Sequence, residues 1–372
     1  MSATHRVEQG PGAAGIDRRR RACLGALLLA GTGVGPVRAE AAPGGAAPVA
    51  GPLERPATVL RDPRRAMLLG LARAGARTVS VGSHGVVLLS DDDGATWRQA
   101  ASVPVSVTLT AVRFVTARVG WAVGHQGVVL RTDDAGEHWT RQLEGRAIAQ
   151  LLLADAVRRG DARAEAEARR AVEEGADKPL LALHFRSEQE GLVVGAFGLV
   201  LATTDGGRHW TPQGDRLDNP KGAHLYTIDR HEDTVLIAGE QGLLLHSGDG
   251  GRSYRRVPTP YAGSYFGVGR DAAGAWVLAG LRGTVLRSDD QGRRWATLAS
   301  PVPASVTALT RDRDGTLWLA NQAGQLLRPT AAAAPLQLAA QTAAQQPADL
   351  LRLDDGRMLI AGWNGITRVS LR

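Results

Sequence analysis

The sequence predicts an all-β protein, a seven-bladed β-propeller with one helical insertion. Three observations predict it: a glycine-anchored motif recurs about every 41 residues, seven copies follow residue 56, and apolar runs of strand length flank each copy. The seven anchors are Gly85, Gly127, Gly198, Gly242, Gly283, Gly324 and Gly365. Their spacings are 42, 71, 44, 41, 41 and 41 residues, so the second interval holds one repeat plus an insertion.

The first 39 residues have the pattern of a secretory signal peptide. Four arginines at 18–21 precede a short apolar run over 22–34, and small residues stand at −3 and −1 of a cleavage site after Ala39. The Arg20-Arg21 pair resembles a twin-arginine signal, so both the Sec and the twin-arginine route stay open. Residues 40–55 are rich in Pro, Gly and Ala and are predicted to form a flexible linker. We therefore expect an exported chain, in the periplasm or at the outer face of the cytoplasmic membrane.

The net charge of +7 does not indicate a nucleic-acid partner. Residues 1–39 contribute +4 of it, and an Arg excess spread over the rest fits a coding bias as well as any function. Cys23 is the one cysteine and lies within the signal, which excludes disulfides, Cys-zinc sites and thiol nucleophiles from the mature chain. No apolar run of spanning length follows residue 40, so no internal membrane span is expected.

Each repeat over residues 56–372 is expected to form a blade of four strands. The apolar runs on either side of the anchor glycine predict the second and third strands, joined by a tight hairpin. The inner strands are predicted at 110–114, 181–185, 226–228, 266–268, 306–310 and 349–353. The seventh repeat stops after its third strand, and residues 57–60 are expected to supply its outer strand and close the ring.

A second motif, Ser/Thr-x-Asp-x-Gly-x-x-Trp, begins five residues after the anchor in the first five repeats. Its acids and aromatic residues are Asp92, Asp134, Asp205, Asp249, Asp290, Trp97, Trp139, Trp210 and Trp295, with Tyr254 replacing Trp in the fourth copy. The carboxylate can accept backbone N–H bonds within its own turn, the glycine permits a positive φ, and the aromatic ring can pack the outer strand. We interpret these residues as a structural hairpin clip, because carboxylates on separate blades lie too far apart for a glycosidase pair.

The insertion over 144–178, between the second and third blades, is predicted to be a helical hairpin broken at Gly160-Asp161. Its first half carries one apolar stripe, formed by Ile148, Leu151, Leu152 and Ala156. Two interpretations stay open: a strut packed on the propeller, or an element that docks a partner.

The hairpins between the second and third strands share one face with the insertion and with the loops 211–225 and 257–264, near the central channel. Elaborate loops on a rigid scaffold are where function usually resides, so this face is the candidate binding site. Its candidate residues are His84, His125, Gln126, Phe197, Gln241, Arg282, Trp363 and Asn364. The alternative is a set of ordinary polar turns.

No catalytic residue, metal or cofactor is predicted. The sequence has no Gly-x-Ser-x-Gly nucleophile elbow and no phosphate-binding loop, and two histidines at neighbouring tips are too few for a metal site.

Two known families use this acidic motif, the Asp-box. Sialidases and related glycoside hydrolases also carry an Arg-Ile-Pro segment before the first box, whereas here the nearest string, Arg256-Val257-Pro258, follows the fourth. The blades, such as 120–127 (GWAVGHQG) with 132–139 (TDDAGEHW), more closely resemble the photosystem II stability/assembly factor family of plants and cyanobacteria and its bacterial relatives. The likeness covers about residues 57–372.

This resemblance implies an exported, non-enzymatic seven-bladed propeller that helps to build a membrane protein complex. The expected partner is an envelope membrane protein or protein complex, with no nucleic acid and no small-molecule substrate. The alternative is an Asp-box protein that binds or cleaves glycans.

Overall fold

Seven antiparallel sheets follow one another along the chain in a computed structural model that describes residues 50–175, 177–330, 334–344 and 346–371. The predicted signal peptide and linker residues 40–49 lie outside the described residues. Six sheets have four strands and one has three, and within each sheet the strands pair in chain order.

The strands of the first four sheets are β1 (Leu68–Ala74), β2 (Arg77–Gly82), β3 (Val87–Ser90), β4 (Arg98–Gln99), β5 (Leu109–Phe114), β6 (Gly120–Gly124), β7 (Val129–Thr132), β8 (Thr140–Leu143), β9 (Leu180–Phe185), β10 (Gly191–Gly195), β11 (Val200–Thr203), β12 (Thr211–Pro212), β13 (Leu225–His231), β14 (Thr234–Gly239), β15 (Leu244–Ser247) and β16 (Arg255–Arg256). The last three sheets comprise β17 (Tyr265–Arg270), β18 (Trp276–Gly280), β19 (Val285–Ser288), β20 (Ala296–Thr297), β21 (Val306–Arg311), β22 (Leu317–Asn321), β23 (Gln325–Arg328), β24 (Gln337–Gln341), β25 (Pro347–Arg352), β26 (Arg357–Gly362) and β27 (Gly365–Ser370).

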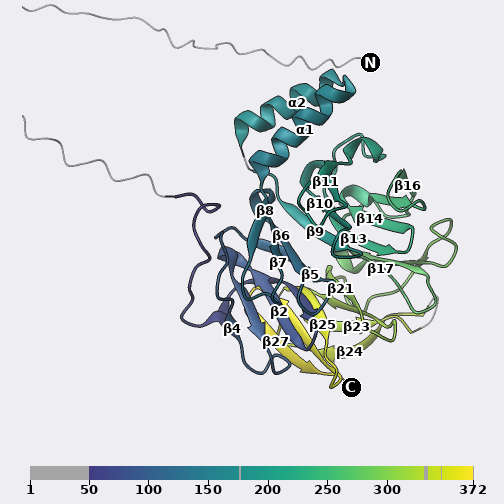
Figure 1. Cartoon of the computed structure of the whole chain (residues 1–372). Helices are drawn as coiled ribbons and strands as arrows, with labels where there is room; N and C mark the ends of the chain where they lie inside the picture. The colour runs from purple at the N-terminus through teal and green to yellow at the C-terminus, as the bar shows by residue number, and fades with distance from the viewer. Residues whose placement is uncertain (1–49, 176, 331–333, 345, 372) are drawn as a thin grey trace, which may run out of the picture. The chain divides into compact units, whose positions relative to one another are not determined.

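The first strand of each sheet lies at the centre of a ring. The inner strands β1, β5, β9, β13, β17, β21 and β25 contact one another in that order, and β25 returns to β1 (Figure 1). Each sheet is therefore one blade, and the predicted seven-bladed β-propeller is confirmed.

The apolar core lies between neighbouring blades. Every residue of β6, β10, β18 and β22 is buried, because a middle strand is covered by a blade on each side. One cluster, for example, joins Val79 and Leu89 of the first blade to Leu130 and Trp139 of the second. Two-sided burial explains why these strands read as continuous apolar runs.

The expectation for residues 57–60 is wrong. They form no strand, and the seventh sheet ends at β27. Their N–H groups instead bond the first blade: Ala57 N donates to Val103 O at 3.0 Å, and Leu60 N to Gln99 Oε1 at 2.8 Å. Pro63 then begins a short 3-10 turn (Pro63–Arg65) capped by Asp62, and this turn contacts β27 without pairing to it as a strand.

The ring closes through direct contact between the first and seventh blades. Leu71 N donates to Asp349 Oδ2 at 2.8 Å, and Leu68 and Leu88 pack with Leu353 and Leu359. An apolar seam of the same kind as the other interfaces thus replaces the predicted shared sheet.

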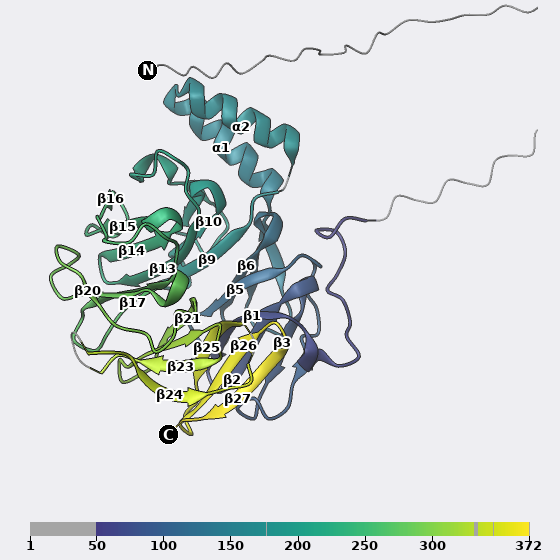
Figure 2. The same cartoon turned by 180° about the vertical axis from the view of Figure 1, so that it is seen from behind.

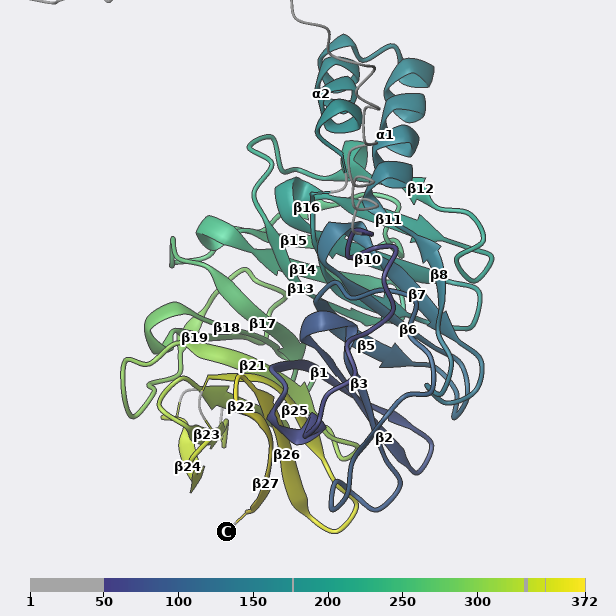
Figure 3. The same cartoon turned by 90° about the vertical axis from the view of Figure 1, so that its left-hand side faces the viewer.

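The insertion consists of α1 (Gly145–Arg159) and α2 (Ala162–Glu174), which pack on each other next to the third blade (Figures 2 and 3). Gly160 ends α1 in the left-handed conformation at φ 67°, and Asp161 caps α2 by accepting from Ala164 N. In the predicted stripe Ile148 and Ala156 are buried. Neither helix of the described chain has the length and hydropathy needed to cross a membrane.

Candidate binding face

The five Asp-box turns share one hydrogen-bond pattern at the end of the blades opposite the candidate face. In each turn the Ser or Thr hydroxyl donates to the Asp carboxylate at 2.7–2.9 Å and accepts from the box glycine N–H at 2.8–3.0 Å. The carboxylate also accepts the N–H of the residue before the aromatic, at 2.8–3.0 Å. These bonds close the turn on itself, which supports the structural interpretation.

The same bonds keep the box carboxylates ionised. Hydrogen bonds from the Thr96 side chain and backbone lower the pKa of Asp92 to about 2. Hydrogen bonds from the backbone and ring of His209 lower the pKa of Asp205, and those from Ser253 and Ser247 lower that of Asp249. A general acid must hold a proton near its working pH, so these groups are poorly suited to that role.

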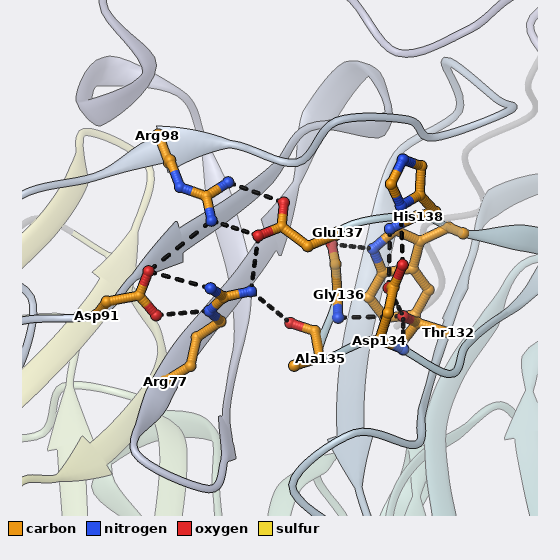
Figure 4. A network of polar contacts seen from close by, with 10 residues as sticks. Arg77, Asp91, Arg98, Thr132, Asp134, Ala135, Gly136, Glu137 and His138 are labelled. Atoms are coloured by element: carbon orange, nitrogen blue, oxygen red, sulfur yellow. Dashed lines mark hydrogen bonds and ion pairs between the residues drawn. The ribbon is translucent and has the colours of Figure 1, made fainter.

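An ion-pair network ties the first blade to the second on this side of the ring (Figure 4). Arg77 on β2 pairs with Asp91 at 2.6 Å and, across the interface, with Glu137 at 2.9 Å. Arg98 bonds the other oxygen of Glu137 at 2.8 Å. Hydrogen bonds from Arg98 hold the pKa of Glu137 below its usual range. The charges of this network thus satisfy one another.

The box aromatics differ in their polar contacts. Trp97, Trp139 and Trp210 each donate Nε1–H to the carbonyl of their own box glycine, at 2.9–3.1 Å. Trp295 donates instead to Pro258 O at 3.1 Å. The hydroxyl of Tyr254 is buried without a hydrogen-bond partner. The aromatic residue of the fourth box therefore lacks the polar contact that the other four aromatics make.

The candidate residues all lie at the opposite end of the blades, where the second strand turns into the third. In five blades this turn has a middle residue in the left-handed region, with φ between 53° and 56°. These residues are His84, Gln126, Phe197, Gln241 and Arg282. His125 stands one position before the middle residue of its turn, so the two tip histidines do not occupy matching positions.

Seven of the eight candidates are exposed. Phe197 and Trp363 are the large apolar ones, with 59% and 55% of their surfaces exposed, and Gln126 is half-buried because α1 begins over its turn. The structure places the candidates on one face but spreads them around the ring. Within the described ranges no three His, Cys, Asp or Glu side chains gather as a metal site would require.

A groove runs between the helical insertion and the third blade. Its volume is about 510 Å³, and its walls come from α1, α2, the tip at 196–198 and the loop after β12. The side chains that define it are Leu152, Ala168, Lys178, Phe197, Leu217 and Lys221. The sequence alone does not reveal this groove, because the distance between an insertion and a hairpin tip 20 or more residues away depends on packing.

An aromatic row leads from the groove toward the ring centre. Phe197 lies 4.7 Å from His224, His224 lies 6.2 Å from Tyr226, and Tyr226 lies 5.5 Å from Phe266, measured between ring centroids. Tyr226 and Phe266 are the second residues of the inner strands β13 and β17. Their shared register could have indicated that they stand side by side.

Two titratable side chains on the inner strands have shifted pKa values. Burial, reinforced by Arg113, Arg230 and Arg270, lowers the pKa of His184 on β9 to about 3. Burial raises the pKa of Asp349 on β25 to about 6, although Leu71 N and Leu350 N both donate to its carboxylate. Both shifts favour the neutral form relative to the free side chain: His184 is neutral at pH 7, and Asp349 takes up its proton below about pH 6.

Comparison with known proteins agrees with this architecture. A family model described as photosynthesis system II assembly factor YCF48 matches residues 162–326. No curated protein sequence matches the chain.

Several solved structures share the fold at low sequence identity. A YCF48 bound to D1 peptide is 17% identical, with a TM-score of 0.62 over 83% of this chain and 95% of that one. YCF48 from Cyanidioschyzon merolae is 14% identical, with a TM-score of 0.60 over 83% and 96%. A streptogramin B lyase is also 14% identical, with a TM-score of 0.64 over 84% and 96%.

A shared propeller fold does not by itself indicate an activity. The family model, which matches residues 162–326, confirms the resemblance predicted from the repeats: this part of the chain is similar to the photosystem II assembly factor family.

Proposed function

We propose that the protein is a non-enzymatic, exported propeller that binds a membrane protein complex and supports its assembly or stability. The observation that carries this proposal is the match of residues 162–326 to the assembly factor family. A YCF48 structure that holds a D1 peptide adds that a propeller of this kind can bind a peptide segment.

The polar chemistry of the two faces supports a binding role over a catalytic one. The box carboxylates are ionised and occupied by their own turns, as shown for Asp92 and Asp134. The opposite face, which is formed by the hairpins between the second and third strands and is called the tip face here, exposes Phe197 and Trp363. Large apolar side chains of this kind are typical of binding surfaces. The partner is therefore proposed to bind the tip face, and hydrolysis of glycans is not favoured.

The proposed location outside the cytoplasm depends on residues 1–39. Their charge and apolar pattern are those of a secretory signal. Fractionation of cells that express the full chain with a C-terminal tag should recover it in the periplasmic or membrane fraction, shortened at its N-terminus. Replacing both Arg20 and Arg21 by Lys should block export if the twin-arginine route is used and leave it unchanged if the Sec route is used.

Deletion of the gene in its own host tests the proposed function. We expect one membrane complex to fall several-fold on native gels while its subunits are still synthesised, and the tagged chain to co-purify with an early subunit. Unchanged complexes together with no co-purified subunit would contradict the proposal. So would turnover of sialosides or β-glucans by the purified chain at rates typical of glycoside hydrolases.

A further inference from the structure

A cavity lies between the third blade and the fourth, toward the Asp-box face, and we call it the interblade cavity. Its volume is about 510 Å³, a size at which protein pockets hold small ligands. Its walls come from β10, β11 and the loop after β12 in one blade, and from the fourth Asp-box and the end of β13 in the other. The two blades lie side by side in Figures 1 and 2. The interblade cavity shares no residue with the groove beside the helical insertion.

The equivalent cleft between the second and third blades is closed by three side chains. Trp121 on β6 and Arg131 on β7 are cross-strand partners, and the Arg131 guanidinium stands 5.3 Å from the centroid of the Trp121 ring. Trp121 Nε1 donates to Gln142 Oε1 at 3.1 Å. Gln142 Nε2 and Arg131 Nη1 both donate to Gly206 O of the next blade, at 2.8 and 3.2 Å. An indole, a guanidinium and an amide therefore fill this cleft and tie the two blades together.

The third blade carries smaller residues at two of these three positions. Leu192 and Ala202 take the places of Trp121 and Arg131, because each pair is the one next to the box threonine in the register of its sheet. Alanine is also the smallest residue at this position of the box-bearing blades, where the others have Leu89, Arg131, His246 and Arg287. The lost side-chain volume explains why the cleft is open here.

The third position keeps its glutamine but loses the donor that it needs. Gln213 matches Gln142, since each follows its box tryptophan by three residues. Gln213 is 4% exposed, its Nε2 donates to Thr211 O at 3.3 Å, and its Oε1 has no partner in the described chain because Leu192 has no N–H to offer. The hydroxyl of Tyr254, which also lines the interblade cavity, is buried without a partner as well. Buried polar groups without partners lower stability, so contact with a bound molecule explains why both are kept.

The charges around the interblade cavity nearly cancel. Arg186 lies 3.6 Å from Glu190, and the ring of His209 bonds Asp205 at 2.6 Å. Three further arginines stand beside two acids, namely Arg216, Arg230, Arg252, Asp233 and Asp249. With charges of both signs in its lining, the cavity selects a ligand by hydrogen bonding more than by charge.

The polar groups that lack a partner narrow the chemistry of the ligand. Gln213 Oε1 only accepts, so it requires a donor, which an ionised carboxylate or phosphate does not supply. Burial raises the pKa of the Tyr254 hydroxyl to about 12, and Arg230 and Arg216 oppose that rise. Both guanidinium groups therefore lie near the hydroxyl and disfavour a cationic ligand. Hydroxyl groups carry no charge and both donate and accept hydrogen bonds, so a ligand rich in hydroxyls matches the cavity.

We propose that the interblade cavity binds a neutral saccharide of one or two rings, whose hydroxyls donate to Gln213 Oε1 and bond the hydroxyl of Tyr254. Both atoms are buried behind the cavity wall, so binding includes a rotation of the Gln213 amide toward the ligand. The box acids nearby, Asp205 and Asp249, are bonded within their own turns, and the inference is one of binding without cleavage. It goes beyond the proposed function, because it adds a site on the face opposite to the one proposed to bind the membrane complex.

Isothermal titration calorimetry of the purified chain with neutral sugars tests the inference. The probes are glucose, galactose, mannose and N-acetylglucosamine, each free and as its methyl glycoside, together with cellobiose. We expect at least one of them to bind with a dissociation constant below about 1 mM. A methyl glycoside that binds as tightly as the free sugar would support the end of a glycan chain as the source of the ligand, and one that binds more weakly would support a free sugar.

Q213L and Q142L are a matched pair, because they make the same change in the open and in the filled cleft. Q213L should weaken the sugar about tenfold and keep the melting temperature, since it removes an acceptor that the folded chain does not use. Q142L should lower the melting temperature, because it breaks the bonds to Trp121 and Gly206, and should alter the affinity for the sugar by no more than about twofold.

Two further variants act on the cavity itself. Y254F should weaken the sugar by a similar factor of about ten while raising the melting temperature, because it removes a buried hydroxyl without a partner. A202R restores the residue type of the second blade and should abolish binding by filling the cavity. If A202R does not fold, Q213L and Y254F still decide the test.

Several results would overturn the inference. They are the absence of binding by every neutral sugar of the panel, equal losses of affinity in Q213L and Q142L, and wild-type affinity in a folded A202R. Binding of the matched uronate at least about tenfold more tightly than the neutral sugar would assign the cavity to an anion and would overturn it too. None of these results bears on the membrane complex, so the proposed function stands or falls by its own test.

Discussion

The two faces of the ring use the same repeat in opposite ways. On the Asp-box face the side chains themselves build each turn, so the residue types recur: Asp92 and Asp205, for example, each have three hydrogen bonds, which come from the same two positions of their boxes. On the tip face the backbone builds the turn, and the left-handed position holds residues as different as His84 and Phe197. A repeat that fixes side chains on one face and only backbone on the other ties the Asp-box side chains to stability and leaves the tip side chains free to vary.

Replacing a tryptophan by alanine on each face is the strongest test of that difference. Trp139 is 3% exposed, packs edge-on to Phe114 and bonds Gly136 O, so W139A should cost about 3–5 kcal/mol in the free energy of unfolding. Trp363 is 55% exposed, and W363A should change that energy by no more than about 0.5 kcal/mol. Urea unfolding measures the free energy of unfolding of both variants. Similar losses in W139A and W363A would contradict the difference between the two faces.

Removing the Ser or Thr hydroxyl of a box should lower the free energy of unfolding nearly as much as removing its aromatic side chain. Thr132 is buried, donates to Asp134 and accepts from Gly136 N, so T132V leaves a buried N–H without a partner. We expect a loss of about 1–3 kcal/mol in unfolding free energy. T140V is the control, because Thr140 is exposed on β8 and its hydroxyl makes one long bond of 3.3 Å. Equal effects of the two variants would mean that the box bonds are not what holds the turn.

What the sequence could predict follows the same division. The boxes and the propeller were readable because each copy repeats the residues that make its own hydrogen bonds. The contact that closes the ring was not predictable, because the sequence of residues 57–60 resembles that of a strand. In the structure these residues bond the first blade instead, Pro63 begins a turn, and β25 contacts β1 directly. The groove was not predictable either, because its walls come from α1, α2 and the third blade, and their approach depends on packing and not on a repeated motif.

Asp349, on the inner strand β25, should respond to pH in the direction opposite to Asp92 of the first box. The folded-state pKa of Asp349 is about 6 against 3.8 unfolded, so its contribution to stability falls as pH rises from about 4 to 6. The folded-state pKa of Asp92 is about 2, so its contribution is present above pH 4 and is lost as pH falls toward 2. D349N should therefore raise the melting temperature at pH 7 and not at pH 4, whereas D92N should lower it at pH 7.

The melting temperature of the wild type, measured as a function of pH, does not separate the contributions of individual titratable groups. His184 has a folded-state pKa of about 3, so its contribution to stability is lost as pH falls below about 6.5, opposite in sign to that of Asp349. Subtracting the melting temperature of the wild type from that of D349N at each pH cancels the contribution of His184, which both proteins share. A difference that does not vary between pH 4 and pH 7 would show that Asp349 keeps its ordinary pKa in the folded state.

The fourth box offers the smallest and most discriminating change, because the polar group of its aromatic residue has no hydrogen-bond partner. Tyr254 is 6% exposed, its hydroxyl has no partner, and burial raises its pKa to about 12. Y254F removes that hydroxyl and keeps the ring packed against Leu192, Val200 and Ile237, so it should stabilise the fold by about 1 kcal/mol. Loss of stability on thermal unfolding would instead mean that the hydroxyl is bonded in solution. The fourth box would then be as complete as the others, and the Asp-box face would be uniformly structural.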